Sequence, residues 1–82
     1  MYSKYIVYMN DMGQETPIIF PNWEPHELMN DKKVISAGFV VIQLNNGVPV
    51  CRCYGKSYTL DINSRPEEDG KLLTKVFIDP HD

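Results

Sequence analysis

Hydrophobic and polar residues alternate near the start of the chain, which is the pattern of strands with one buried face. Residues 4–9 (KYIVYM) are rich in β-branched and aromatic side chains, and residues 16–20 (TPIIF) form a second run of the same kind. A turn that ends at Gly13 separates the two runs. Because Pro17 has no N–H group to donate to a neighbouring strand, the second run is predicted to lie at the edge of a sheet or to begin there.

A β-hairpin is predicted in the centre of the chain. Residues 33–44 and 48–54 are joined by Asn46-Gly47, the strongest short hairpin signal in a sequence. This loop fixes the register, and the predicted pairs are Asn45 with Val48, Ile42 with Cys51, Val41 with Arg52, Val40 with Cys53 and Phe39 with Tyr54. One face then carries Val40, Ile42, Leu44, Cys51 and Cys53, and the other carries Phe39, Val41, Gln43, Val50, Arg52 and Tyr54.

Short elements are predicted on both sides of this hairpin. Before it, residues 26–29 form a short helix with Pro25 near its first turn, and Asn30 and Asp31 end it. After it, Gly55 marks a bulge or bend. The alternating residues Tyr58, Leu60 and Ile62 then predict a further short strand.

A longer helix is predicted at the end of the chain. It begins with the capping box Ser64-Arg65-Pro66-Glu67 and ends at Pro80. Its core-facing stripe consists of Leu72, Leu73, Val76 and Phe77. The acidic run 67–69 is expected to be solvated and to favour the positive end of the helix dipole. Gly70 costs about 1 kcal/mol relative to Ala inside a helix, and the sequence offers no reason for it.

These elements predict an α+β fold for residues 1–82 as a single domain: a small antiparallel sheet of four to five strands, in the order ββαβββα, with one C-terminal helix packed on one face. The helix can cover only one face. Either it buries the face with Cys51 and Cys53, which the frequent burial of cysteine favours, or it covers the face with Phe39 and Tyr54 and leaves the cysteines outward.

Composition and charge restrict the function. The chain has 82 residues and a net charge of −3 with scattered Lys and Arg, which argues against nucleic-acid binding. Its longest apolar run, 37–42, is far shorter than the roughly 20 residues of a membrane span. With no signal-peptide pattern after Met1, we expect a cytoplasmic protein with reduced cysteines.

The motifs that suggest catalysis are incomplete. Gly55-Lys56-Ser57 would belong to a phosphate-binding loop only with glycine in place of Val50. Cys51 and Cys53 could supply two zinc ligands, but only His26 and His81 could complete the set. We therefore expect no metal and no cofactor, and we interpret the cysteines as small buried residues.

No catalytic residue is predicted either. His26 could act as a general base, and Ser36 or Ser57 as a nucleophile, but nothing in their spacing brings an acid, a base and a nucleophile together. A small enzyme that uses His26 or the cysteines is accordingly the least favoured of the functions considered.

The hairpin face with aromatic residues and arginine is the best candidate for partner binding, since interface cores are enriched in both. The candidate residues are Phe39, Val41, Arg52 and Tyr54, with Tyr5 and Trp23 as weaker candidates. Stacking of RNA bases on such a face is disfavoured by the negative charge. The chain is thus expected to be non-enzymatic and to bind a protein through a sheet face or edge. The alternative is a homodimeric structural or stabilising protein with no other partner.

Three segments resemble a group of small uncharacterised proteins of bacteriophages and prophages. They are "YIVYMNDMGQETPIIFP" (5–21), "VISAGFVVI" (34–42) and "CYGKSYTLDINSRPEED" (53–69), which together cover most of the chain. The resemblance implies a short accessory protein made in the cytoplasm of a bacterial host. Such proteins often act by binding, for example by blocking a host or defence enzyme, and the resemblance brings no known activity or site residues.

Overall fold

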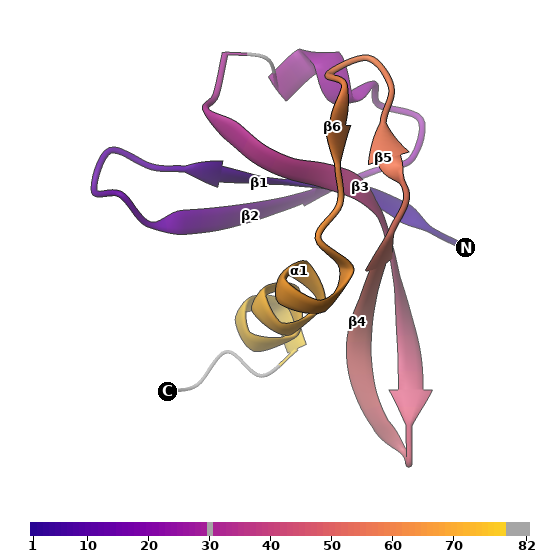
Figure 1. Ribbon diagram of the computed structural model, residues 1–82. Helices are drawn as coiled ribbons and strands as arrows, with labels where there is room; N and C mark the ends of the chain where they lie inside the picture. The colour runs from indigo at the N-terminus through magenta and orange to yellow at the C-terminus, as the bar shows by residue number, and fades with distance from the viewer. Residues whose placement is uncertain (30, 79–82) are drawn as a thin grey trace.

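The computed structural model describes residues 1–29 and 31–78, and the main sheet has four antiparallel strands in the order β2-β1-β3-β4. The strands are β1 (Ser3–Met9), β2 (Glu15–Phe20), β3 (Val34–Asn45) and β4 (Val48–Tyr54) (Figure 1). The predicted helix ends at Asn30 and Pro80, and the tail residue His81, lie outside the described residues.

The remaining elements are short, and the α+β order is as predicted except for one more strand between β4 and the C-terminal helix. A single 3-10 turn, η1 (His26–Met29), connects β2 to β3, and β5 (Lys56–Ser57) pairs with β6 (Ile62–Asn63) in a separate two-stranded sheet. The C-terminal helix α1 (Pro66–Leu73) continues as a π-helical turn, η2 (Thr74–Ile78). The prediction of an antiparallel sheet with one C-terminal helix packed against it is confirmed.

The local predictions about the sheet hold residue by residue. Each predicted β3–β4 pair is present, from Phe39 opposite Tyr54 to Asn45 opposite Val48. Asn46 and Gly47 both have positive φ, 54° and 80°, as a primed two-residue turn requires. Strand β2, which contains Pro17, lies at the edge of the sheet as predicted.

The helix covers the face of the sheet that carries the cysteines. Leu73 packs there in a core with Tyr5, Val7, Val40, Cys51 and Cys53. The opposite face is not bare, because a second core of Ile6, Phe20 and Ala37 lies on it. Leu60, Ile62 and Met29 pack against that second core, so η1 and the β5–β6 hairpin cover part of the face that was expected to be open.

The predicted strand through Tyr58, Leu60 and Ile62 is wrong. Residues 58–61 form a turn, in which Asp61 has a φ of 56° and the Leu60 N–H donates to the Ser57 hydroxyl at 3.2 Å. Tyr58 is 81% exposed. Closing this tight turn allows β5 and β6 to pair with each other, which the alternation of apolar residues did not indicate.

The predicted capping box is also wrong. Arg65 occupies the N-cap position of α1, without a side-chain cap bond. The Ser64 hydroxyl instead donates to the Gly55 carbonyl at 2.7 Å, and the Ser64 N–H donates to the same oxygen at 3.1 Å. Ser64 therefore holds the bend after β4, because a long-range acceptor competes successfully with the helix end.

The predicted core stripe of the helix is only partly buried. Leu73 is fully buried, but Val76 and Phe77 are 40% and 44% exposed. In a π-helical turn each N–H group bonds five residues back instead of four, so Ile78 takes the core side below Leu73. Val76 and Phe77 are rotated toward solvent.

Gly70 is explained by the close approach of α1 to the edge of β4. A Cβ atom at this position would lie 3.1 Å from the Cys51 carbonyl oxygen. The Cys51 N–H donates to the Thr74 hydroxyl at 2.8 Å, and that hydroxyl donates to the Gly70 carbonyl at 2.7 Å. The helix thus covers part of the β4 edge, which would otherwise be open.

A buried carboxylate joins the start of α1 to the sheet. Asp69 is fully buried, contrary to the expectation of a solvated acidic run. The Tyr5 hydroxyl donates to its Oδ2 at 2.5 Å, and the Arg65 backbone N–H donates to the same oxygen at 2.9 Å. The Arg65 guanidinium donates to Oδ1 from Nε and Nη2, at 3.0 and 2.8 Å. Arg65 also pairs with Glu15 of β2 at 2.9 Å.

Tyr5→Phe removes one donor from this buried carboxylate. Because hydrogen bonds to charged groups contribute about 1.5–3 kcal/mol, we expect the free energy of unfolding in urea to fall by about that amount. The matched control is Tyr58→Phe, since Tyr58 is exposed and its hydroxyl should contribute almost nothing. Equal unfolding midpoints for Tyr5→Phe and the wild type would show that the Asp69 bond does not stabilise the fold.

Gly38→Ala tests the packing of β3 against β4. The added Cβ would lie 2.5 Å from the Tyr54 carbonyl oxygen and 3.2 Å from the Ser64 Cβ. Backbone must move to admit it, so we expect a loss of about 2–3 kcal/mol, the upper part of the range for overpacking. Gly13→Ala is the comparison, because Gly13 has a φ of 75° but open space around it. If Gly38→Ala is the milder of the two changes, the close approach is not what requires glycine.

Candidate protein-binding surface

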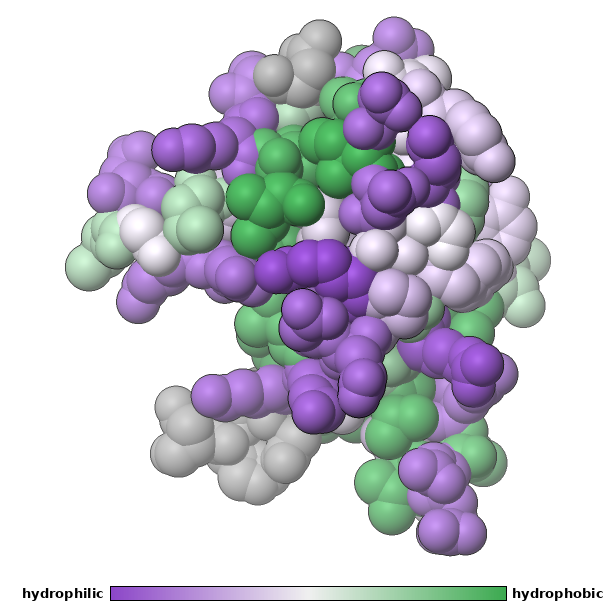
Figure 2. All heavy atoms as spheres, in the orientation of Figure 1, coloured by the Kyte–Doolittle hydropathy of each residue, from purple (hydrophilic) through white to green (hydrophobic). Residues whose placement is uncertain are grey.

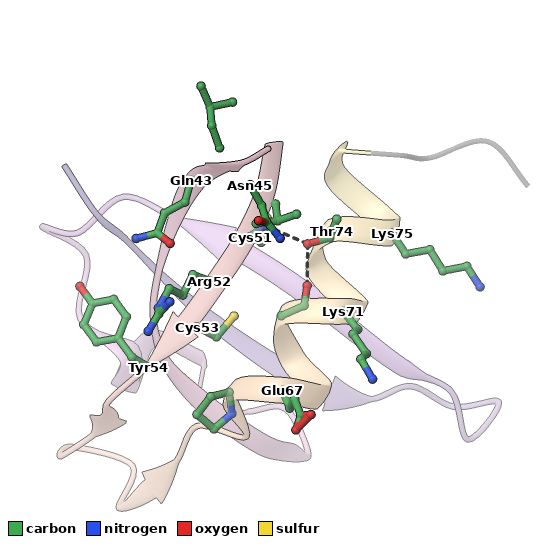
Figure 3. A pocket seen from close by; sticks show the side chains of 14 residues that line it. Gln43, Asn45, Cys51, Arg52, Cys53, Tyr54, Glu67, Lys71, Thr74 and Lys75 are labelled. Carbon is green, nitrogen blue, oxygen red and sulfur yellow. Dashed lines mark hydrogen bonds between the residues drawn. The ribbon is translucent and has the colours of Figure 1, made fainter. Parts of the chain in front are cut away.

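A groove of about 930 Å³ runs along β4, between the β3–β4 hairpin and the helical segment α1–η2. We call it the β4 groove. Strand β4 contributes Val50, Cys51, Arg52, Cys53 and Tyr54, the end of β3 contributes Gln43, Leu44 and Asn45, and the helical segment contributes Pro66, Glu67, Gly70, Lys71, Thr74 and Lys75. Figure 3 shows Cys51 and Thr74 facing each other where the two walls meet.

The cysteines form the closed part of the groove and are poorly suited to thiolate chemistry. Cys51 and Cys53 are 5% and 2% exposed. Burial raises the pKa of both thiols, that of Cys53 to about 12, with a further contribution from the nearby Asp69 carboxylate. Since the thiolate is the nucleophile and the metal ligand, neutral thiols in this position act as packing groups.

Arg52 and Tyr54 line the strand side of the groove, but their side chains are exposed on the face of the hairpin that is turned away from the helix (Figure 3). Gln43 projects on the same side (Figure 3). The Tyr54 ring is 41% exposed and rests on the Phe39 ring, with 5.7 Å between centroids. Arg52 is exposed and forms no salt bridge within residues 1–29 and 31–78. The aromatic ring and the guanidinium are therefore both accessible.

The helical wall adds further positive charge. Lys71 and Lys75 line the groove one helical turn apart, and their ammonium groups extend outward (Figure 3). Neither forms a salt bridge to another described residue. Glu67 is the acidic residue of the lining. Arg52 and these lysines point to opposite sides of the groove (Figure 3), so positive charge flanks the groove on both sides in a chain with a net charge of −3.

The structure does not bring all the predicted binding residues together. Arg52 and Tyr54 lie in the β4 groove, whereas Phe39 and Val41 are half-buried. Tyr5 is completely buried in the core, which leaves it no surface for a partner.

Trp23 is 76% exposed and lies in a separate hollow of about 330 Å³ with Met1 and Tyr2. The sequence reasoning missed Lys71 and Lys75. Their spacing of four residues on a predicted helix could have indicated them.

His26 has a structural position. Its ring is 4% exposed, and its Nε2 lies 2.9 Å from the Gly38 carbonyl oxygen, an arrangement in which the Nε2–H group donates. The rings of Phe20 and Phe39 meet it edge-on, at 5.4 and 5.8 Å. Burial lowers its pKa, with a smaller effect from the Lys4 charge. The neutral ring holds η1 against the sheet.

Within residues 1–29 and 31–78, no group of three or more His, Cys, Asp or Glu side chains could hold a metal ion. No helix in these ranges is both long and apolar enough to cross a membrane.

The raised thiol pKa values predict slow alkylation of the native protein. At pH 8, iodoacetamide should modify Cys51 and Cys53 many times more slowly in the native protein than in urea, as measured by mass spectrometry. The same shift makes the stability of the fold depend on pH, because the unfolded thiol ionises near pH 8.5 and the folded Cys53 thiol only near 12. Keeping this thiol protonated therefore contributes to the free energy of unfolding. This contribution is complete below about pH 8.5 and is lost as the pH rises toward 12. Equal alkylation rates in both states would contradict the burial of the thiols.

The chain was compared with known protein families, curated proteins and solved structures. No protein-family model matches the chain, and no curated protein or solved structure matches it significantly.

Proposed function

We propose that this chain is a non-enzymatic binding module that holds an acidic segment of a protein partner against the β4 groove. The observation that carries the proposal is the exposed pair of Arg52 and Tyr54 beside a groove whose helical wall carries Lys71 and Lys75. Arginine and tyrosine are among the residues that most often dominate binding energy at interfaces.

The groove favours binding by side chains over addition of a strand to β4. The outward N–H group of Cys51 is already bonded to Thr74, and Pro49 has no N–H group to offer. A partner strand would find few free backbone donors on this edge. Of the two modes expected from the sequence, a sheet edge or a sheet face, β4 therefore supports the mode that uses side chains.

The charge of the groove specifies the partner. A guanidinium can bind a carboxylate through two parallel hydrogen bonds, and Lys71 and Lys75 provide further positive charge on the opposite wall. Tyr54 offers an aromatic surface, which its contact with Phe39 holds in place. These groups together fit an acidic segment that also contains an apolar residue.

The biological setting is part of the proposal. The resemblance to small phage and prophage proteins suggests an accessory protein that acts in the cytoplasm of a bacterial host and binds a host protein there. The buried, neutral His26 and the buried thiols support a binding role over catalysis, because neither offers an accessible reactive group.

The double variant Arg52→Ala/Tyr54→Ala tests this proposal. Tagged wild-type protein would be used to capture partners from a bacterial lysate, and the affinity for the captured protein would then be measured by calorimetry. Loss of two interface hot-spot residues should weaken the affinity at least about 30-fold. Binding should also weaken as salt is raised, because positive charge flanks the groove.

The matched control is Lys33→Ala/Tyr58→Ala, which removes one exposed cation and one exposed tyrosine outside the groove. The control should bind like the wild type. If the Arg52→Ala/Tyr54→Ala variant captures the same proteins with unchanged affinity, the β4 groove is not the binding surface.

A further inference from the structure

The end of β3 has a partner strand on one side only. Strand β1 pairs with β3 no further than Ser3 opposite Val40, whereas β4 continues to Val48 opposite Asn45. Within residues 1–29 and 31–78, no strand pairs with the other edge of Val41–Asn45. The hairpin accordingly projects from the body of the protein as a two-stranded ribbon (Figure 1). Such ribbons are at best marginally stable alone.

The backbone groups of this stretch point toward the open edge at alternate residues. The Cys51 N–H group points away from β3, because it donates to Thr74. In an antiparallel ladder, residues opposite each other either both face one another or both face away. Ile42, which lies opposite Cys51, therefore directs its N–H and C=O outward, and so does Leu44.

This edge lacks the protection that the other edges have. Strand β2 contains Pro17, and β4 has Pro49 and the covering helix. The stretch Val41–Asn45 (VIQLN) contains neither a charged residue nor a proline, which are two usual means of preventing edge pairing. Its apolar side chains are also uncovered: Ile42 is 63% exposed and Leu44 is 75% exposed. Figure 2 shows apolar surface near the tip of the hairpin.

We propose that a second copy of this chain pairs with this edge in antiparallel orientation, with the two-fold axis at Gln43. The open stretch is limited by Ser3 at one end and by the Asn46-Gly47 turn at the other, and Gln43 is its midpoint. Ile42 then lies opposite Leu44 of the second copy, and Gln43 lies opposite Gln43. Val41 lies opposite Asn45.

The stretch is self-complementary in three respects. The outward backbone groups belong to Ile42 and Leu44, so both of these cross-chain pairs can exchange N–H···O bonds. Their apolar side chains share one face, where apolar cross-strand pairs stabilise a sheet. No like charges meet in this register, because the stretch is uncharged. A second copy satisfies these conditions without any change of sequence.

The pairing goes beyond the proposed function, although Gln43, Leu44 and Asn45 of the open edge also line the end of the β4 groove. It uses the edge of β3 opposite to β4, so Arg52 and Tyr54 stay exposed, and a dimer presents two grooves. The short contact places it among small, transient interfaces. Association should therefore be visible by sedimentation velocity only as the concentration rises toward about 1 mM.

Charge substitution at the two-fold axis tests the register. Gln43 is exposed, so Gln43→Lys and Gln43→Glu should both fold, but each places two like charges opposite one another. Each variant alone should sediment as a monomer where the wild type associates, and an equimolar mixture of the two should associate again. The control Val48→Lys, at an exposed position on the other strand of the hairpin, should associate like the wild type.

The outcomes decide the proposal separately from the partner experiment. A wild type that remains monomeric overturns it, as does a Gln43→Lys variant that associates normally or a mixture that stays monomeric. A second measurement uses Gln43→Cys: the non-hydrogen-bonded pair at the axis brings Cα atoms to about 4.5 Å, within disulfide range. Oxidation to a covalent dimer should be much faster than for Val48→Cys, and equal rates would overturn the register.

Discussion

The burial of Asp69 is the constraint on which the arrangement of this small protein depends. A carboxylate completely removed from water is costly unless its charge and its hydrogen-bonding capacity are satisfied. Here Tyr5 from the first strand and Arg65 from the helix start supply the donors, and Arg65 continues to Glu15 on the second strand. These bonds fix the position of α1 relative to β1 and β2, the first two strands of the chain. Burial, together with the hydrogen bond to this carboxylate, also raises the pKa of the Tyr5 hydroxyl.

The placement of the helix decides which surfaces remain for binding. Once α1 is held at Asp69, Gly70 and Thr74 lie against the backbone of β4 and close part of that edge. The groove between the hairpin and α1 is a consequence of this contact, as is the exposure of Arg52 and Tyr54. Ile42 and Leu44, near the tip of the hairpin, remain exposed. The two proposed interaction surfaces therefore lie on the same ribbon and share Gln43, Leu44 and Asn45.

Several residues of the segments 34–42 and 53–69 have structural positions in this chain. Gly38 admits the Tyr54 carbonyl at a distance where a side chain would collide, Ser64 holds the bend at Gly55, and Arg65 neutralises Asp69. Physical constraints on packing account for these parts of the segments without any reactive role. The exposed groups most suited to recognition, Arg52, Lys71 and Lys75, lie outside this framework.

The sequence by itself determined whatever depends on neighbouring residues. Asn46-Gly47 dictated the turn and with it the whole β3–β4 register, and the missing N–H of Pro17 kept β2 at an edge. Local patterns failed where a distant group competed for the same atoms. Ser64 bonds to Gly55 instead of capping the helix, and Asp69 is buried against Tyr5 instead of being solvated. The π-helical turn, which exposes Val76 and Phe77, was not predicted either. Which residues share a groove was likewise decided only by the tertiary structure, because the groove joins β4 to a helix packed there through the backbone contacts of Gly70 and the hydroxyl of Thr74.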